Sequence, residues 1–231
     1  MNSVTYNTDC LEAMRATDDN QFDLACVDPP YGIGADVGLG FSSVDKRDGK
    51  AIYRPTYAGG WDNARPDAAY FTEILRVSRN AIIWGGNYFA DLLASTTHWI
   101  FWDKHNPMPT FSDGELAYTT FARKSVSRIS LAYWGHQTAG ETVRIHPTQK
   151  PVALYKWLLT NYAKPGQTIL DTHLGSGSSR IAAYDLGFDF TGYELDKDYF
   201  DAQERRFKNH TAQAKLFEPE PIIETQDSLF A

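Results

Sequence analysis

Residues 168–196, which read TILDTHLGSGSSRIAAYDLGFDFTGYELD, indicate the fold class of this chain most clearly. The apolar run Thr168–Asp171 predicts a buried strand, Ser178–Leu186 predicts a helix, and Phe190–Glu194 predicts a second strand. A strand, a turn, a helix and a strand in this order form one βαβ unit of a parallel sheet. The glycine-rich turn lies at the carboxyl end of the first strand, where such sheets bind their ligands.

The same alternation of short apolar runs and helix-like stretches continues along the chain and predicts an α/β protein. The expected architecture is a mostly parallel, Rossmann-like sheet with helices on both faces, in one domain over residues 1–209. Insertions are expected near residues 32–66 and 123–145, and residues 210–231 are expected to form a flexible tail. The other predicted strands are Leu24–Val27, Ala81–Trp84, Trp99–Trp102 and Leu116–Phe121, and the other predicted helices are Val152–Tyr162, Tyr199–Phe207 and one that ends over Phe71–Val77.

Composition limits the class of protein. The 231 residues, 42% of them hydrophobic, suffice for one sizeable core. Cys10 and Cys26 are too few for a disulfide framework, and no metal site is expected. No leader segment and no apolar run long enough for a bilayer is visible, so a cytoplasmic protein is expected. The net charge is -7, although residues 41–150 carry +3, and this balance neither favours nor excludes nucleic acid.

The turn Gly175-Ser176-Gly177-Ser178 and the acid Glu194 together suggest a nucleoside site. Glycines admit a ligand close to the backbone, and a carboxylate at the end of the next strand can accept both hydroxyls of a ribose. The turn alone is equally compatible with a tight connection that binds nothing. The absence of a full G-x-G-x-x-G disfavours a dinucleotide.

Asp28-Pro29-Pro30-Tyr31 follows a predicted buried strand and can serve an aromatic amine. The Asp28 carboxylate and the Pro29 carbonyl offer two acceptors for the N–H groups of the amine, while Tyr31 offers a stacking surface. Accepting both hydrogen bonds would localise the nitrogen lone pair toward a sulfonium methyl. A strand-ending turn with an exposed tyrosine explains the tetrapeptide about as well.

Four motifs in sequence order resemble the β class of DNA amino-methyltransferases, the N6-adenine/N4-cytosine family of DPPY type. They are Asp28–Tyr31, His146–Pro151, Asp171–Ser178 and Gly192–Glu194, and the resemblance runs from about Thr5 to Phe207. It implies the class I methyltransferase fold in a circularly permuted order, because the catalytic tetrapeptide precedes the cofactor glycines.

The resemblance also implies the reaction and the site. S-adenosylmethionine would give its methyl group to N6 of an adenine in DNA by base flipping and direct in-line transfer, with Asp28, Pro29, Pro30 and Tyr31 as catalytic residues. His173 stands where the family usually has phenylalanine. The cofactor residues that the resemblance implies are Asp9, Cys10, Asp28, His146, Thr148, Gln149, Lys150, Asp171, His173, Gly175, Ser176, Gly177, Ser178, Glu194 and Leu195.

Several alternatives stay open. Cytosine N4 is chemically close, although that group commonly begins its tetrapeptide with serine rather than Asp28. A covalent attack on cytosine C5 is disfavoured, since neither Cys10 nor Cys26 follows a proline. A non-catalytic DNA-binding member and an RNA methyltransferase are further possibilities, as are restriction-linked and orphan roles.

The expected partner is double-stranded DNA, and a homodimer is left open. Gln226-Asp227-Ser228-Leu229-Phe230 resembles the peptide by which bacterial proteins bind the replication sliding clamp, although residues 213–217 half-match it and an apolar pair can also dock on its own core. The candidate DNA contacts are Arg47, Lys50, Arg54, Arg123, Lys124 and Arg128.

Overall fold

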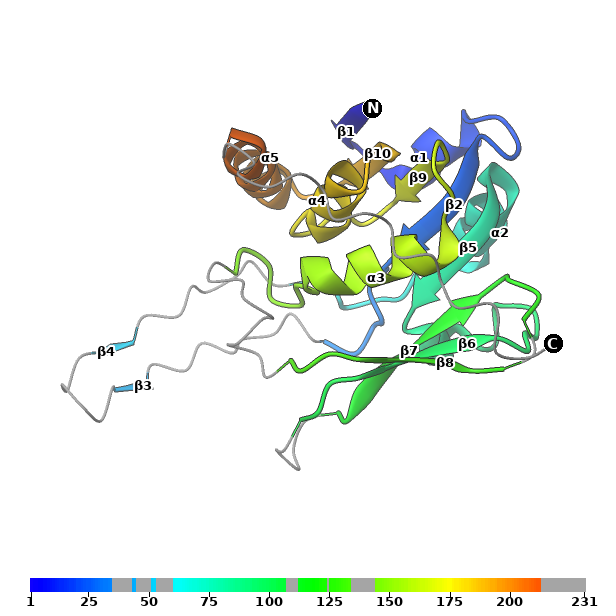
Figure 1. Ribbon diagram of the computed structural model, residues 1–231, viewed down its shortest axis with the longest axis horizontal. Helices are drawn as coiled ribbons and strands as arrows, with labels where there is room; N and C mark the ends of the chain where they lie inside the picture. Colours follow the sequence, from blue (N-terminus) through cyan, green and yellow to red (C-terminus); the bar gives the residue numbers. More distant parts are fainter. Residues whose placement is uncertain are drawn as a thin grey trace.

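The chain is organised around one mixed sheet of eight strands, seen in the computed structural model of Figure 1. The strands follow one another across the sheet as β1 (Ser3–Asn7), β10 (Asp189–Glu194), β9 (Thr168–Asp171), β2 (Phe22–Val27), β5 (Ser78–Trp84), β7 (Gly114–Thr119), β6 (Trp99–Asp103) and β8 (Ser127–Ser130). The structure describes residues 1–34, 60–106, 112–123, 125–133 and 144–212, together with the backbone of the paired strands β3 (Ser43–Val44) and β4 (Ala51–Ile52).

The first five strands across the sheet are parallel, and the edge beyond them is mixed. β7 runs antiparallel to both β5 and β6, while β8 is parallel to β6. The predicted Rossmann-like architecture is therefore confirmed. In this order the strand that leads into Asp28 lies beside β9, the strand that leads into the glycine turn, although about 140 residues separate them.

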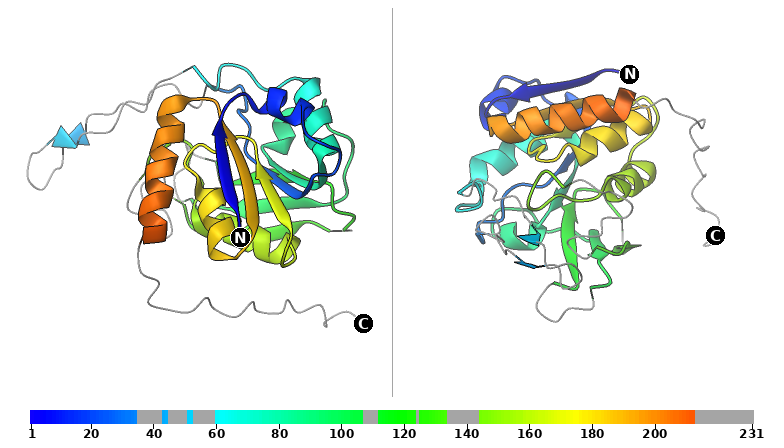
Figure 2. Two further views of the ribbon diagram at one scale, coloured as in Figure 1. Left: turned by 90° about the horizontal axis from the view of Figure 1, so that it is seen from above. Right: turned by 90° about the vertical axis from the view of Figure 1, so that its left-hand side faces the viewer.

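Helices cover both faces of the sheet because the buried strands are apolar on both sides. Along β2, Leu24 and Cys26 belong to one core cluster, whereas Ala25 and Val27 belong to the other. The first cluster packs under α3 (Val152–Tyr162) and α4 (Ser178–Asp185), and the second packs under α1 (Cys10–Arg15) and α2 (Ala68–Val77). The last helix, α5 (Lys197–Ala212), lies against α4 and β10 (Figure 2).

Differences from the sequence predictions concern short or terminal elements. β8 lies within the stretch expected to be an insertion, and Ile129 is its one buried residue, so its sequence lacks an apolar pattern. The helix α5 continues to Ala212, beyond the expected domain boundary at residue 209. Of the helices in the described ranges, none is both long enough and apolar enough to cross a membrane.

The parallel strands bring their carboxyl ends to one edge of the sheet. Leu24 of β2 pairs with Ile169 of β9, so that Asp28 and the turn after β9 emerge side by side. On the other side of β9, strand β10 ends at Glu194. This edge is where parallel α/β sheets bind ligands.

Candidate active site

Asp28 comes directly after β2, and both of its carboxylate oxygens accept hydrogen bonds from neighbouring side chains. The Lys150 Nζ lies 2.5 Å from Oδ2, and the Tyr31 hydroxyl donates to Oδ1 over 2.7 Å. The Lys150 side chain is only 5% exposed and that of Asp28 15%. A buried ion pair of this kind depends on good geometry, since removing either partner leaves an uncompensated charge.

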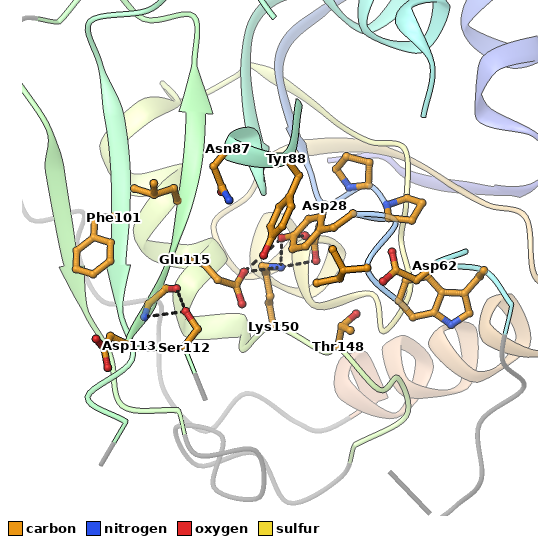
Figure 3. A pocket seen from close by; sticks show the side chains of 17 residues that line it. Asp28, Asp62, Asn87, Tyr88, Phe101, Ser112, Asp113, Glu115, Thr148 and Lys150 are labelled. Atoms are coloured by element: carbon orange, nitrogen blue, oxygen red, sulfur yellow. Dashed lines mark hydrogen bonds and ion pairs between the residues drawn. The ribbon is translucent and has the colours of Figure 1, made fainter. Parts of the chain in front are cut away.

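A second carboxylate, that of Glu115 on β7, completes the cluster (Figure 3). Its Oε2 lies 3.1 Å from the Lys150 Nζ and 3.3 Å from the Tyr31 hydroxyl, and its Oε1 pairs with Lys104. Two carboxylates and two ammonium groups therefore balance one another at the edge of the sheet.

The electrostatics distinguish the two acids. Burial and the nearby Glu115 carboxylate raise the pKa of Asp28 against the opposing effect of Lys150. Burial would also raise the pKa of Glu115, but Lys150 and Lys104 together lower it to about 2. Burial raises the pKa of the Tyr31 hydroxyl well above its ordinary value, so the phenol keeps its proton.

The Tyr31 ring is held by residues that follow β5. It stacks on Tyr88 with the ring centroids 4.9 Å apart and the planes at 16°, and it meets Phe89 edge-on. Both residues belong to the short 3-10 helix η1 (Gly86–Phe89). Gly85 before it has a φ of +68°, and a Cβ built there would lie 2.2 Å from the ring of Tyr31. Only glycine satisfies both the backbone and the packing at this position.

A cavity of about 760 Å³ opens beside this cluster. Its walls come from the end of β2, from η1 and from the start of β7, and Figure 3 shows Asn87, Glu115, Thr148 and Lys150 around it. Its volume falls within the range of small-molecule sites. The sequence-predicted residues that line it are Asp28, Pro29, Pro30, Tyr31, Thr148 and Lys150.

The glycine turn after β9 lies next to the end of β10. Gly175 and Gly177 have φ values of +48° and +70°. The Glu194 carboxylate accepts the Gly175 N–H at 2.8 Å through Oε2 and the Asp196 N–H at 2.9 Å through Oε1. Burial raises the pKa of Glu194. Each carboxylate oxygen keeps a further lone pair, so Glu194 can accept additional hydroxyl donors.

The serines of the turn are buried and hydrogen-bonded to each other and to α5. The Ser176 and Ser178 hydroxyls lie 3.0 Å apart. Arg206 donates to the Ser176 carbonyl over 2.7 Å and to the Ser178 hydroxyl over 2.9 Å. The turn is therefore fixed by the last helix as well as by its own glycines.

Asp171 and His173 precede the glycine turn and make hydrogen bonds next to it. Asp171 accepts the Ser179 hydroxyl at 2.5 Å and the His173 N–H at 3.0 Å, and burial raises its pKa to about 7. The His173 Nδ1 lies 3.0 Å from the Thr172 hydroxyl, and its ring meets Tyr70 edge-on. Burial lowers the pKa of His173 to about 4, so the imidazole is neutral at pH 7.

The segment 146–150 connects the turn to the cavity. The His146 ring lies against Tyr199 and Trp61, and a Cβ on Gly175 would be 3.5 Å from it. Burial lowers the pKa of His146 to about 3. The buried Gln149 amide accepts the Ile145 N–H at 3.0 Å. Lys150, for which the resemblance implies a cofactor contact, lies in the Asp28–Glu115 cluster.

The remaining predicted cofactor residues flank the Glu194 end of the site. Asp9 caps α1 by accepting the Leu11 N–H at 2.7 Å, and its side chain is exposed. Burial raises the pKa of the neighbouring Cys10 to about 12, so its thiol is protonated. Leu195 is 69% exposed and leaves an apolar surface beside Glu194.

Two of the predicted DNA contacts lie in the described part of the chain. Arg123 stacks over the Tyr162 ring, 4.6 Å from its centroid, and donates to the Asn161 carbonyl. Arg128 on β8 pairs with Asp103 at 2.7 Å. Outside the described residues lie Arg47, Lys50, Arg54, Lys124 and the segment Gln226–Phe230.

Sequence reasoning did not identify Glu115, Lys104, Asn87 or Tyr88 as site residues. Of these four residues, only Glu115 stands out in the sequence, because it is an acid at the start of a mostly apolar strand. Its role depends on the antiparallel pairing of β7 with β5, which no local pattern reveals.

Comparisons of sequence and of fold show which known proteins this chain resembles. The family model N6_N4_Mtase, described as DNA methylase, matches residues 122–205, which include His146, the glycine turn and Glu194. The type II methyltransferase M2.MboI of Moraxella bovis is 25% identical in an alignment of 251 positions, gaps included, that covers 89% of this chain and 88% of that protein.

Solved structures share the fold. The M1.HpyAVI–SAM complex superimposes with a TM-score of 0.57 at 19% identity and covers 89% of this chain and 98% of its own. The cytosine-N4-specific PvuII DNA methyltransferase superimposes with a TM-score of 0.56 at 12% identity. The superposition covers 96% of this chain and 90% of that protein. With the Asp28 tetrapeptide and the glycine turn adjoining at one edge of this sheet, the chain is similar in sequence and in fold to the DNA amino-methyltransferases of the N6/N4 family.

Proposed function

We propose that this DNA amino-methyltransferase methylates N6 of adenine, which it receives as a base flipped out of double-stranded DNA. The observation that carries the proposal is the position of Asp28, which lines the 760 Å³ cavity and follows a strand adjacent to the glycine turn. A base in the cavity and a cofactor on the turn would approach each other at Asp28.

The chemistry requires two acceptors for one amino group. The Asp28 carboxylate and the Pro29 carbonyl are the acceptors at this position, and both residues line the cavity. Hydrogen bonds to both N–H groups localise the amine lone pair, which otherwise delocalises into the ring. Both acceptors directly follow β2 and precede or belong to the two prolines, which fix the backbone, so the acceptors themselves need little reorganisation during transfer. The Tyr31 ring provides the stacking surface for the base.

S-adenosylmethionine is the cofactor of this family, and its sulfonium supplies an electrophilic methyl group when it is bound. The residues present fit it: two glycines of positive φ open the turn, and Glu194 has unused lone pairs for the ribose hydroxyls. Exposed Leu195 offers an apolar surface for the adenine ring, and Asp9 an acceptor for its amino group. His173 is neutral and offers a polar surface where phenylalanine is usual.

Adenine is favoured over cytosine because the tetrapeptide begins with Asp28 rather than serine. The fold itself serves both bases, since a cytosine-N4-specific enzyme superimposes on this chain. The direct test is incubation of the full chain with labelled S-adenosylmethionine and unmethylated genomic DNA, followed by nucleoside analysis. We expect N6-methyldeoxyadenosine. Label in N4-methyldeoxycytidine would refute the choice of base, and no label in DNA would refute the activity.

A further inference from the structure

Asp28 has hydrogen-bond donors on both of its carboxylate oxygens. Lys150 donates to Oδ2 and Tyr31 donates to Oδ1. Each Asp28 oxygen keeps a further lone pair for an amine that enters the cavity, but the donors already bound, one of them an ammonium, weaken the carboxylate as an acceptor. The acceptor is ionised in both cases, and the ammonium forms the stronger bond because its donor is charged as well.

Both competing donors also face one other acceptor. The Glu115 Oε2 lies 3.1 Å from the Lys150 Nζ and 3.3 Å from the Tyr31 hydroxyl, compared with 2.5 Å and 2.7 Å for the bonds to Asp28. The other Glu115 oxygen pairs with Lys104. The two donors are thus shared unequally between two carboxylates, and Asp28 holds the closer position.

We propose that Glu115 is a positioning residue, which takes over the Lys150 ammonium and the Tyr31 hydroxyl when the target base enters and so frees Asp28 for the amine. This inference rests on the proposed function of Asp28. It assigns no contact between Glu115 and the base.

The charges of the cluster make such an exchange feasible. The pairing of Glu115 with Lys104 keeps its carboxylate ionised at neutral pH, so it remains an acceptor throughout. One carboxylate oxygen can accept two hydrogen bonds, which suffices for both donors at Oε2. The ammonium keeps an anionic partner in either position, so no buried charge is left unpaired during the exchange.

The test compares Glu115→Gln, Lys150→Met and the double variant in the full chain. Single-turnover transfer of label from S-adenosylmethionine to unmethylated DNA is followed from pH 5.5 to 9, cofactor affinity by calorimetry, and the Asp28 carboxyl by carbon-13 NMR. Glu73→Gln on α2 is the matched control, since it removes a similarly half-buried glutamate, paired with Arg76, that does not line the cavity. Urea unfolding shows whether each variant is folded.

We expect Glu115→Gln to bind cofactor normally but to transfer methyl at least about tenfold more slowly, as Lys150 then has Asp28 as its remaining carboxylate partner. Losing a neighbouring negative charge should lower the pKa of Asp28, and Lys150→Met should raise it, so the acidic limb of the rate profile moves in opposite directions. The double variant should recover much of the rate lost in Glu115→Gln, because the competing ammonium is gone.

A purely structural role for Glu115 predicts different results. The two losses would then add in the double variant, or Glu115→Gln would match Glu73→Gln in rate and pH profile, and either result would overturn the inference. If Lys150→Met does not fold, the rate and pH profile of Glu115→Gln alone test the positioning role of Glu115. A wild-type chain that methylates no DNA would instead refute the proposed function, and the inference with it.

Discussion

Asp28 lines the cavity and also belongs to the ion-pair cluster with Lys150 and Glu115. Its substitution therefore tests the proposed chemistry directly. Asp28→Ala should reduce single-turnover methyl transfer by about 100-fold or more, because one of two preorganised acceptors is lost. Cofactor affinity should change little, since the Glu194 end of the site is untouched. Asp189→Asn, at the amino end of β10, is the control. Near-normal transfer by Asp28→Ala would show that the amine is activated elsewhere.

Glu194 is the residue that we propose to hold the ribose of the cofactor. Glu194→Gln should weaken S-adenosylmethionine binding by about tenfold or more, because a charge-assisted contact to the ribose is lost. The change also disturbs the turn, since Gly175 and Asp196 both donate to this carboxylate. Calorimetry on the folded variant measures the effect, with Glu73→Gln as the matched substitution. An unchanged dissociation constant would remove Glu194 from the cofactor site.

The sequence identified individual site residues where a motif is continuous along the chain. The Asp28 tetrapeptide and the turn at Gly175 were singled out because each places several functional groups on a few adjacent residues. Glu115 could not be predicted in this way, because it reaches Asp28 only through the order of strands in the sheet. The resemblance implies a cofactor contact for Lys150, and no pattern in the sequence reveals that its side chain pairs with Asp28.

The connection between β5 and η1 illustrates how an element positions a functional ring. Gly85→Ala combines a left-handed backbone with a Cβ that would lie 2.2 Å from Tyr31. We expect a loss of about 1–3 kcal/mol in the free energy of unfolding and a large loss of methyl transfer, because the Tyr31 ring must move. Urea unfolding and single-turnover assays measure the two effects.

Gly166→Ala separates these two contributions. Gly166 has a φ of +82°, but a Cβ there would meet no atom within 4 Å. The Gly166→Ala variant should therefore lose about as much stability from backbone strain as Gly85→Ala, but it should transfer methyl groups at the normal rate. Equal transfer by the two variants would mean that Tyr31 does not depend on Gly85.

Elements bounded by strong signals were predicted closely. The helix over Val152–Tyr162 follows Pro151 and precedes Pro165-Gly166, and its predicted bounds agree with the structure. The strand over Thr168–Asp171 also agrees. β8 was missed because a short edge strand needs only one buried side chain, here Ile129, and η1 because a single 3-10 turn has no periodic pattern.

The molecule as a whole places basic side chains at the same edge as the site. Arg128 lies on β8, parallel to β6, and pairs with Asp103 at the carboxyl end of β6. Arg128→Ala should weaken DNA binding and reduce the slope of log affinity against log salt by about one, as expected for one lost phosphate contact. Fluorescence anisotropy at several salt concentrations measures this slope.

Arg79 provides the matched control for this surface. It lies near the amino end of β5, at the opposite edge of the sheet, and its side chain is as exposed as that of Arg128, at 62% and 63%. Arg79→Ala should leave the slope unchanged. Equal slopes for the two variants and the wild type would place the DNA-binding surface elsewhere on the molecule.

The stacking of Tyr88 on Tyr31 has a consequence for how selectively the enzyme captures a base. An extrahelical base that uses this face of Tyr31 has to replace Tyr88, and an aromatic pair of this kind contributes about 0.5–1.5 kcal/mol. The apparent affinity for any free base is then reduced by the fraction of time that the ring face is covered. Bases that open briefly by thermal fluctuation gain little from this pocket, whereas a base held out of the helix by further contacts to the duplex can displace the tyrosine. If the target base stacks on this face of Tyr31, Tyr88 is an internal competitor that links capture of the base to correct docking of the surrounding DNA.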